Sequence, residues 1–352
     1  MIDLKRLRQD PEGSRATLLR RRDPAVAALL DELLDFDRRR RGLLTRVERL
    51  KAERNTATEE VAGLKRAGQP ADELTARLRI SGDEVKALDT ELREIDAELD
   101  RRALALPNFP LDDVPDGDAS ANTVLRTWGE EPRFDFVPRP HWELATELGI
   151  LDLPAGAALA GSGFPVFRGA GARLVRALAA FMLDLHTREH GYVEVAPPYL
   201  VNRATLTGTG QLPKFEEDLY RASEDDLFLI PTAEVPVTNL LRDRILEASD
   251  LPLGYTAYTP CFRREAGAHG KDTRGLIRVH QFDKVELVRF VRPEESAAEH
   301  EKLTGHAEAV LHRLGIPYRI VALAAGDTGF ASARTYDLEV WAAGVGAWLE
   351  AS

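Results

Sequence analysis

Cysteine and long apolar runs are almost missing from this chain of 352 residues. Its single cysteine, Cys261, excludes an internal disulfide and a zinc site built from cysteines, and it is typical of a protein of the reducing cytosol. No apolar run approaches the roughly 18 residues that a transmembrane helix needs, and the N-terminal MIDLKRLRQD lacks the apolar stretch of a signal peptide. We therefore expect a cytoplasmic protein that has no contact with a membrane.

Net positive charge is also lacking, which at first argues against a nucleic-acid partner. The formal net charge is −11, but its distribution along the chain matters more than its sum. Residues 1–106 carry 23 of the 47 basic and 22 of the 58 acidic side chains, a net charge of +1, so the remainder carries −12. The N-terminal third is thus the part that could approach a polyanion without a general penalty. This permits RNA binding and does not prove it.

A chain of this length is too long for one ordinary core, so two domains are expected. Residues 1–106 hold two runs with apolar residues at the alternating spacing of four and three that is typical of a coiled coil. Gly68-Gln69-Pro70 separates the runs, and Asp23-Pro24 is placed to begin the first helix. The pattern predicts an antiparallel pair of helices about 50 Å long. The two seams are Leu29, Leu33, Phe36, Arg40, Leu43, Val47, Leu50, Arg54, Ala57, Val61 and Leu64, and Leu74, Leu78, Ser81, Val85, Leu88, Leu92, Ile95, Leu99, Arg102 and Leu106.

This helical arm has two interpretations. The default is a structural or dimerising coiled coil. The functional interpretation uses basic side chains off the seam, which could follow an RNA backbone and sense its shape rather than its base sequence. These side chains are Arg38, Arg39, Arg41, Arg46, Arg49, Lys51, Lys65 and Arg66.

A linker is predicted at residues 107–125, because PNFPLDDVPDGDAS, which begins it, is rich in proline and aspartate. Residues 126–352 would form the second domain. In this domain His186 and His190, at positions i and i+4 of a predicted helix, could bind a metal. No third ligand is near them in the sequence, so we interpret them as residues of the helix surface.

The stretch from Thr259 to Val288 contains two β-rich runs, the first ending at Phe262 and the second beginning at Ile277. A polar loop that contains glycine, residues 266–275, separates them, and this pattern predicts an antiparallel hairpin. Its cations suit an anionic nucleotide, because guanidinium groups match phosphate oxygens two at a time. The alternative is an exposed hairpin with a solvated run of charge. The cations are Arg263, Arg264, Lys271, Arg274 and Arg278.

The string FRREAG…DTRGLIRVHQFDKVEL in this hairpin resembles motif 2 of class II aminoacyl-tRNA synthetases, in the version found in seryl-tRNA synthetases. A predicted helix at 172–190 and strand at 191–201 resemble motif 1, which usually forms the dimer interface, and 208–217 resembles a mobile segment of the family. The resemblance implies an α+β fold. An N-terminal antiparallel two-helix coiled-coil arm would precede a class II antiparallel β-sheet domain flanked by helices.

The resemblance also implies an ATP site on the hairpin. Arg263 would contact the α-phosphate and the substrate carboxylate, and Arg278 would lie across the triphosphate, so these two are the expected catalytic residues. Glu265 would bind the adenine amino group, Phe282 would stack on the ring, and Val279 would contact the nucleotide through its backbone. Mg²⁺ would bridge the phosphates with few protein ligands.

A serine pocket is implied by the family's T-x-E element, here Thr232-Ala233-Glu234, together with Glu286 and Arg263. A small polar substrate needs an anion for its ammonium group and hydrogen-bonding partners for its hydroxyl, and these residues supply both. Such a pocket rejects alanine, because alanine would leave its buried polar groups unpaired. Taken alone, Thr-Ala-Glu could equally be the start of a helix.

The sequence departs from the family near its C-terminus, where we find no third motif with its terminal arginine. Glu350 and Ser352 match the start of the family's E-x-S-S element, which implies ATP binding by both residues and metal binding by Glu350. We therefore expect a catalytic domain that is incomplete at its C-terminal end and that activates serine weakly or not at all. A catalytically inactive tRNA-binding or carrier-charging paralogue is one alternative, and a structural coiled-coil protein is another.

The reaction implied by the resemblance has two steps. L-serine and ATP would form seryl-adenylate, and the seryl group would pass to the 3′ end of tRNA(Ser), which the helical arm would grip by its long variable arm. The loop at 266–275 would contact that 3′ end. We expect a homodimer, and the sequence leaves open whether tRNA(Sec) is charged as well.

Overall fold

The structure is a computed structural model that describes residues 2–266 and 274–352. It divides into two compact units. The first comprises Met1–Asp112 with Phe330–Ala333, and the second comprises Asp113–Gly329 with Arg334–Ser352. The first is helical and the second mixes sheets and helices, so the predicted α+β class is confirmed. The domain and linker bounds drawn from the sequence stay a prediction.

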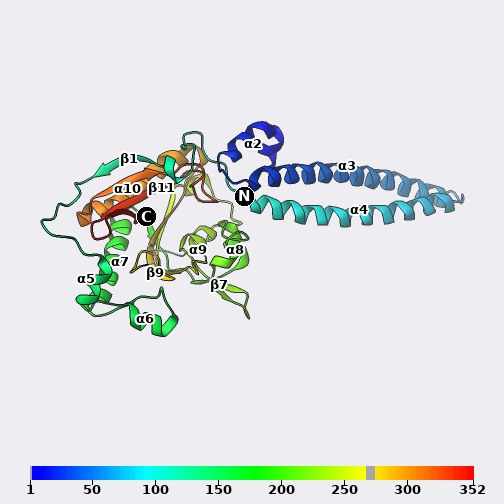
Figure 1. The fold of residues 1–352 in the computed structure, drawn as a ribbon. Helices are drawn as coiled ribbons and strands as arrows, with labels where there is room; N and C mark the ends of the chain where they lie inside the picture. The colour runs from blue at the N-terminus through cyan, green and yellow to red at the C-terminus, as the bar shows by residue number, and fades with distance from the viewer. Residues whose placement is uncertain (1, 267–273) are drawn as a thin grey trace. The chain divides into compact units, whose positions relative to one another are not determined.

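The first unit is built on two long helices that run side by side (Figure 1). Helix α3 spans Ala25–Arg66 and α4 spans Asp72–Ala105, preceded by the short helices α1 (Leu4–Gln9) and α2 (Pro11–Leu19). Gly68, with φ of 69°, lies in the turn between the long helices, where the Gln69 amide donates to the Leu64 carbonyl oxygen at 2.9 Å. This is the bond of a left-handed helix cap, so the predicted break and the antiparallel pair are confirmed.

The predicted seam forms the contact between the two helices. Val47 and Leu50 of α3 pack with Val85, Leu88 and Leu92 of α4 in one buried cluster. A second cluster gathers residues of α1, α2, α3 and α4, and there Leu30 is fully buried while the predicted Leu29 only packs against it. Between the helices, ion pairs join Arg40 to Asp96, Arg46 to Glu84 and Lys51 to Asp89.

The described residues of the second unit form four sheets. The largest has the strand order β1-β10-β11-β12, and the sheet that carries the candidate site has the order β4-β8-β9, with β4 parallel to β8. The other two sheets have the orders β5-β7-β6 and β2-β3. The strands are β1 Thr123–Trp128, β2 Leu151–Asp152, β3 Val166–Phe167, β4 Val193–Glu194, β5 Leu200–Asn202, β6 Arg221–Ala222, β7 Leu227–Leu229, β8 Leu253–Phe262, β9 Gln281–Phe290, β10 Tyr318–Ala322, β11 Tyr336–Ala342 and β12 Ala347–Glu350.

Helices flank these sheets. They are α5 His141–Glu147, α6 Leu153–Ala160, α7 Ala170–Arg188, α8 Arg203–Gly208, α9 Glu234–Asn239 and α10 Ser296–Leu314. Helix α7 contacts all three strands of the site sheet, and α9 contacts β9. Within the described ranges, none of the helices is long and apolar enough to span a membrane.

Strands β8 and β9 form the antiparallel hairpin that the sequence predicts. Their register pairs Ala257 with Glu286, Thr259 with Lys284, and Cys261 with Phe282. Ala257, Thr259 and Cys261 are fully buried. Strand β9 begins at Gln281 rather than at Ile277. Cys261 is thus a small buried side chain of the hairpin.

Three histidines and a tyrosine link α7, α10 and the segment before β4. The Nδ1 atoms of His186 and His190 lie 2.9 Å apart, and the His190 ring stacks on His306 with centroids 4.1 Å apart. The Tyr192 hydroxyl lies 2.9 Å from His306 Nδ1. Because His186 is only 2% exposed, its interpretation as a surface residue is wrong. Among the described residues, no group of three or more His, Cys, Asp or Glu is placed to hold a metal ion.

The histidine cluster predicts a pH-dependent contact between α7 and α10. Burial and the neighbouring imidazoles lower the pKa of His186 and His306 to about 4. The charges of Arg289 and Lys302 also lower the pKa of His306, whereas the charge of Glu299 raises it. Burial lowers the pKa of His190 as well, between Glu189 and Arg313. As the pH falls from 6.5 towards 4, these histidines become protonated in the unfolded chain but stay neutral in the folded chain. The free energy of unfolding therefore decreases over this pH range.

For His186 alone, the free energy of unfolding falls by about 3 kcal/mol at pH 4, and well above pH 6.5 its titration causes no loss of stability. Hydrogen exchange of peptides from α7 and α10 measures it. We expect the opening free energy to fall between pH 6.5 and 4.5, and to fall less in His186→Gln, which keeps a polar side chain but does not titrate. An equal fall in both proteins would contradict this prediction.

Candidate active site

One face of β9 presents the polar side chains of the candidate site. Phe282, Lys284 and Glu286 alternate along the strand and therefore lie on the same face of the sheet. Opposite them, the buried segment from Pro231 to Ala233 leads into α9, whose Val237 packs with Ala233 and Ala257. This packing places the T-x-E element against the hairpin, although Thr232 and Glu286 are separated by 54 residues in the sequence.

Thr232 stands at the centre of a polar cluster. Its hydroxyl donates to Glu286 Oε2 at 2.6 Å and accepts from Lys284 Nζ at 2.7 Å and from the Glu234 amide at 3.2 Å. Lys284 Nζ also pairs with Glu286 Oε2 at 2.6 Å. Thr232 is only 5% exposed, so its hydroxyl is held in one orientation by these three partners.

Glu234 adds a second carboxylate to this cluster. Its side chain keeps access to solvent on one part, but partial burial of the carboxylate disfavours its charged form and raises its pKa. The nearby charge of Glu286 raises the pKa further. Lys284 and Arg263 act in the opposite direction. Two carboxylates balanced by two cations are suited to a zwitterionic ligand, because an ammonium group would relieve the repulsion between the carboxylates.

Arg263 follows β8 directly and is held by backbone contacts. Its amide donates to the His280 carbonyl oxygen at 2.9 Å, and its Nε donates to the Pro231 carbonyl oxygen at 3.3 Å. Its guanidinium lies over the Phe282 ring, 5.1 Å from the centroid. The guanidinium is thus fixed between the T-x-E segment and the aromatic ring, with an exposed side that can receive an anion.

Glu265 and Arg278 form an ion pair with each other. Glu265 adopts a left-handed backbone conformation with φ of 51°, which is uncommon for a residue other than glycine. The side chain of Glu265 is 15% exposed and that of Arg278 is 52% exposed. The structure therefore brings together two residues for which the sequence predicts separate contacts with the nucleotide, and those contacts stay predictions.

A cavity of about 350 Å³ lies between the hairpin and α7. Val279 and Phe282 line it together with Phe164, and α7 contributes Val175 and Met182. Val279 itself is 8% exposed. The walls of this cavity are mainly apolar, so it offers packing for flat or apolar groups near Phe282.

Glu350 and Ser352 belong to a different sheet. Glu350 ends β12 and is paired with Glu339, and the Ser352 carbonyl oxygen accepts from the Leu338 amide at 2.8 Å. Burial raises the pKa of the neighbouring Asp337 to about 7, and Glu350 contributes to this shift. Their predicted contacts with ATP and metal stay untested.

The first unit and the sheet domain each match a known family. Residues 1–110 match the family described as "Seryl-tRNA synthetase N-terminal domain", and residues 214–352 match "tRNA synthetase class II core domain (G, H, P, S and T)". The serine–tRNA ligase of Gemmatimonas aurantiaca is 54% identical over 353 residues, which cover 100% of this chain and 83% of that protein. This chain belongs to the seryl-tRNA synthetase family. The serine–tRNA ligase of Nitratidesulfovibrio vulgaris is also 54% identical, with 82% of that protein covered.

Solved structures of seryl-tRNA synthetases have the same fold. That of Pyrococcus horikoshii, complexed with ATP, superposes with a TM-score of 0.94 at 36% identity, covering 99% of this chain and 83% of that chain. The cytoplasmic enzyme of Naegleria fowleri, in complex with AMP, gives 0.85 at 25% identity, covering 97% and 81%. The predicted membership of this class II family is confirmed.

Lys284 is a member of this synthetase's polar cluster that the sequence reasoning missed. The alternation of Phe282, Lys284 and Glu286 on one strand was a usable signal, since residues two apart share a face. Arg274 is described at the end of the hairpin loop, whereas Lys271 and most of the loop predicted to contact the tRNA lie outside the described residues.

Proposed function

We propose that this chain acts as a serine–tRNA ligase, which activates L-serine with ATP and transfers the seryl group to tRNA(Ser). The observation that carries the proposal is the cluster of Thr232, Lys284 and Glu286 beside Arg263 on one face of the β8–β9 hairpin. A carboxylate pair suited to an ammonium group adjoins an arginine suited to a phosphate. This is the arrangement that an amino-acid adenylate requires.

In the first step an oxygen of the serine carboxylate would attack the α-phosphorus of ATP and form a new O–P bond. The bond from the α-phosphorus to the oxygen that bridges to the β-phosphate would break, and pyrophosphate would leave. The nucleophile is already ionised at neutral pH, so the chain does not have to supply a general base. Its contribution is positioning and the neutralisation of charge on the phosphoryl oxygens. Arg263 would serve both tasks, and this is supported by the position of its guanidinium between the Pro231 carbonyl oxygen and the Phe282 ring.

The serine pocket would use the polar cluster directly. Glu234 and Glu286 would receive the ammonium group, and Thr232 would contact the substrate beside them. Lys284 holds the Glu286 carboxylate in place and orients the Thr232 hydroxyl. Alanine would leave part of this hydrogen-bonding capacity unused, which is the physical basis for its rejection.

The nucleotide, entering as its magnesium complex, would lie along the hairpin. Phe282 offers a ring face to adenine, Val279 packs beside it, and Glu265 with Arg278 provides a polar contact for the base and the triphosphate. Few protein ligands are expected for the Mg²⁺, with Glu350 as the proposed one.

For the second step we propose that the α3–α4 arm contacts the tRNA. Most of its basic side chains are paired with acidic side chains, but exposed ion pairs contribute little stability, so a phosphate group can replace the acidic partner. A tRNA-binding measurement would also show whether tRNA(Sec) binds.

We also propose a homodimer formed through α7 and β4, where Leu174 and Val193 are 55% and 59% exposed. We propose a cytoplasmic location as well.

Calorimetry with a non-hydrolysable seryl-sulfamoyl analogue of seryl-adenylate tests this function independently of turnover. We expect the analogue to bind at least about a hundredfold more tightly than its alanyl counterpart, since hydroxyl recognition commonly gives such ratios. A tRNA with a long variable arm should bind more tightly than one with a short arm. ATP–pyrophosphate exchange with serine measures the turnover itself.

Equal binding of the seryl and alanyl analogues would contradict the proposed pocket. Binding of tRNA without binding of the analogue would instead support the tRNA-binding paralogue. Analytical ultracentrifugation of the same preparation tests the homodimer, and a monomer at micromolar concentration would contradict it.

A further inference from the structure

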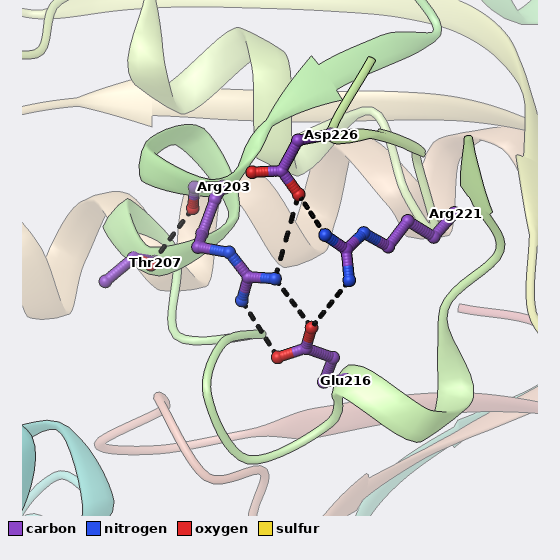
Figure 2. Close-up of polar contacts among 5 residues, drawn as sticks. All are labelled: Arg203, Thr207, Glu216, Arg221 and Asp226. Carbon is purple, nitrogen blue, oxygen red and sulfur yellow. Dashed lines mark hydrogen bonds and ion pairs between the residues drawn. The ribbon is translucent and has the colours of Figure 1, made fainter. Parts of the chain in front are cut away.

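Two arginines and two carboxylates hold the segment between α8 and β6 (Figure 2). Arg203 donates from both terminal nitrogens to Glu216, at 2.8 and 2.6 Å. Arg221 donates to Asp226 at 2.6 Å and lies 3.8 Å from Glu216. Because Arg203 meets Glu216 with two parallel bonds, this contact fixes direction as well as distance. We call these four residues the clamp.

The clamp is attached to the core of its unit. Both guanidinium groups lie over the ring of Phe228, 5.2 Å from its centroid for Arg203 and 5.5 Å for Arg221, and Phe228 is fully buried. Arg203 begins α8, which is tied to α9 by the Asn239 amide group donating to the Thr205 carbonyl oxygen at 2.9 Å. The clamp therefore positions the segment relative to the helix that begins with Glu234.

Two residues beyond Glu216, Asp218 reaches the hairpin. Its backbone carbonyl oxygen accepts from the Arg264 amide at 2.9 Å, and its side-chain Oδ1 accepts from the Ala266 amide at 3.2 Å. These two amides lie on either side of Glu265, whose backbone is in the left-handed region. A conformation that costs free energy persists only where its surroundings hold it, and Asp218 supplies two of the bonds that do so.

We propose that Asp218, held by the clamp, is a positioning residue for the nucleotide. It fixes the backbone on both sides of Glu265 and so sets where the Glu265–Arg278 pair stands. The inference rests on the proposed function, because it assigns these residues to ATP rather than to serine. The serine cluster around Thr232 and Glu286 has no bond to Asp218 among the described contacts, so the two substrates should respond differently.

The test compares binding of ATP and of L-serine by calorimetry in the full chain. Asp218→Ala should weaken ATP binding by about tenfold, since it removes one charge-assisted bond to a backbone amide, while serine binding should stay within about twofold. Asp218→Asn should weaken ATP binding less than Asp218→Ala does and leave serine binding unchanged, because its amide oxygen can still accept from the Ala266 amide but without the charge. Glu217→Ala, at an exposed neighbouring carboxylate, is the matched control and should leave both affinities unchanged.

Glu216→Ala removes the contact of the clamp with the segment and tests the second half of the inference, which is that the clamp holds Asp218 in position. ATP binding should weaken in this variant too, and the double variant with Asp218→Ala should bind ATP no worse than Asp218→Ala alone, because both changes release the same contact. Full additivity would show that the clamp acts through another route and would overturn this half.

The outcomes separate the inference from the proposed function. If the unchanged chain binds neither ATP nor serine, the proposed function fails. If it binds both, and Asp218→Ala leaves ATP binding intact or weakens both ligands equally, the inference alone fails. Should Asp218→Ala not fold, as judged by its thermal transition, Glu216→Ala decides, since a selective loss of ATP affinity supports the inference and its absence overturns it.

Discussion

Replacing Arg263 with methionine is expected to lower the affinity for ATP by about a hundredfold or more. The guanidinium is held over Phe282 and against the Pro231 carbonyl oxygen, so the side chain is already oriented before the nucleotide arrives. Each bond from such a group to a phosphate oxygen contributes about 1.5–3 kcal/mol, and the planar group can make two of them. Methionine keeps much of the apolar contact with the ring and removes these bonds. Calorimetry with ATP measures the loss.

Arg292→Met is the matched control for this experiment. Arg292 follows the other end of the same hairpin, where its guanidinium donates to the Ala248 carbonyl oxygen, and it loses the same charge on substitution. Its ATP affinity should stay within about threefold of the unchanged chain, because a distant exposed charge is largely screened. If both variants lost affinity to the same extent, general electrostatics rather than a contact at Arg263 would explain the effect.

Replacing Glu286 with glutamine is expected to weaken serine binding by about ten- to a hundredfold. The change preserves the shape of the side chain but removes the negative charge that Lys284 pairs with and that the substrate ammonium group would meet. It also weakens the arrangement that orients the Thr232 hydroxyl. The affinity for ATP, measured separately, should change by less than about threefold.

Asp283→Asn is the matched control on the same strand. Asp283 lies beside Lys284, but the alternation of side chains along β9 places it on the opposite face of the sheet, next to Tyr258. This variant should bind serine as the unchanged chain does. Unchanged serine binding in Glu286→Gln would remove that residue from the pocket, and an equal loss in both variants would indicate a general weakening of β9.

The local elements of the fold could be predicted from the sequence because local patterns specify them. The heptad spacing predicted α3 and α4, and glycine and proline near residue 68 predicted their turn. The hairpin followed from two β-rich runs around a polar loop. The short helices α1 and α2 were missed, although Asp10-Pro11 is a helix-start signal and Asp10 does cap α2.

The site could be predicted only through family resemblance, since its contacts join distant segments. The local sequence pattern does not predict the contact of Thr232 with Glu286. Taken alone, Thr-Ala-Glu could be either a pocket element or the start of a helix. The Arg203–Glu216 contact and the bonds of Asp218 to the hairpin could not be predicted either, because they join separate segments of the second unit that only the folded chain brings together. The left-handed backbone of Glu265 carries no sequence signal at all.

The most direct test of the account is a crystal structure of this chain bound to the seryl-sulfamoyl analogue of seryl-adenylate. We predict the adenine against the Phe282 ring, the sulfamoyl group at Arg263, and the ammonium nitrogen about 3 Å from a carboxylate oxygen of Glu234 or Glu286. An analogue bound away from these four side chains, or bound with its seryl group pointing away from Thr232, would contradict the central claim.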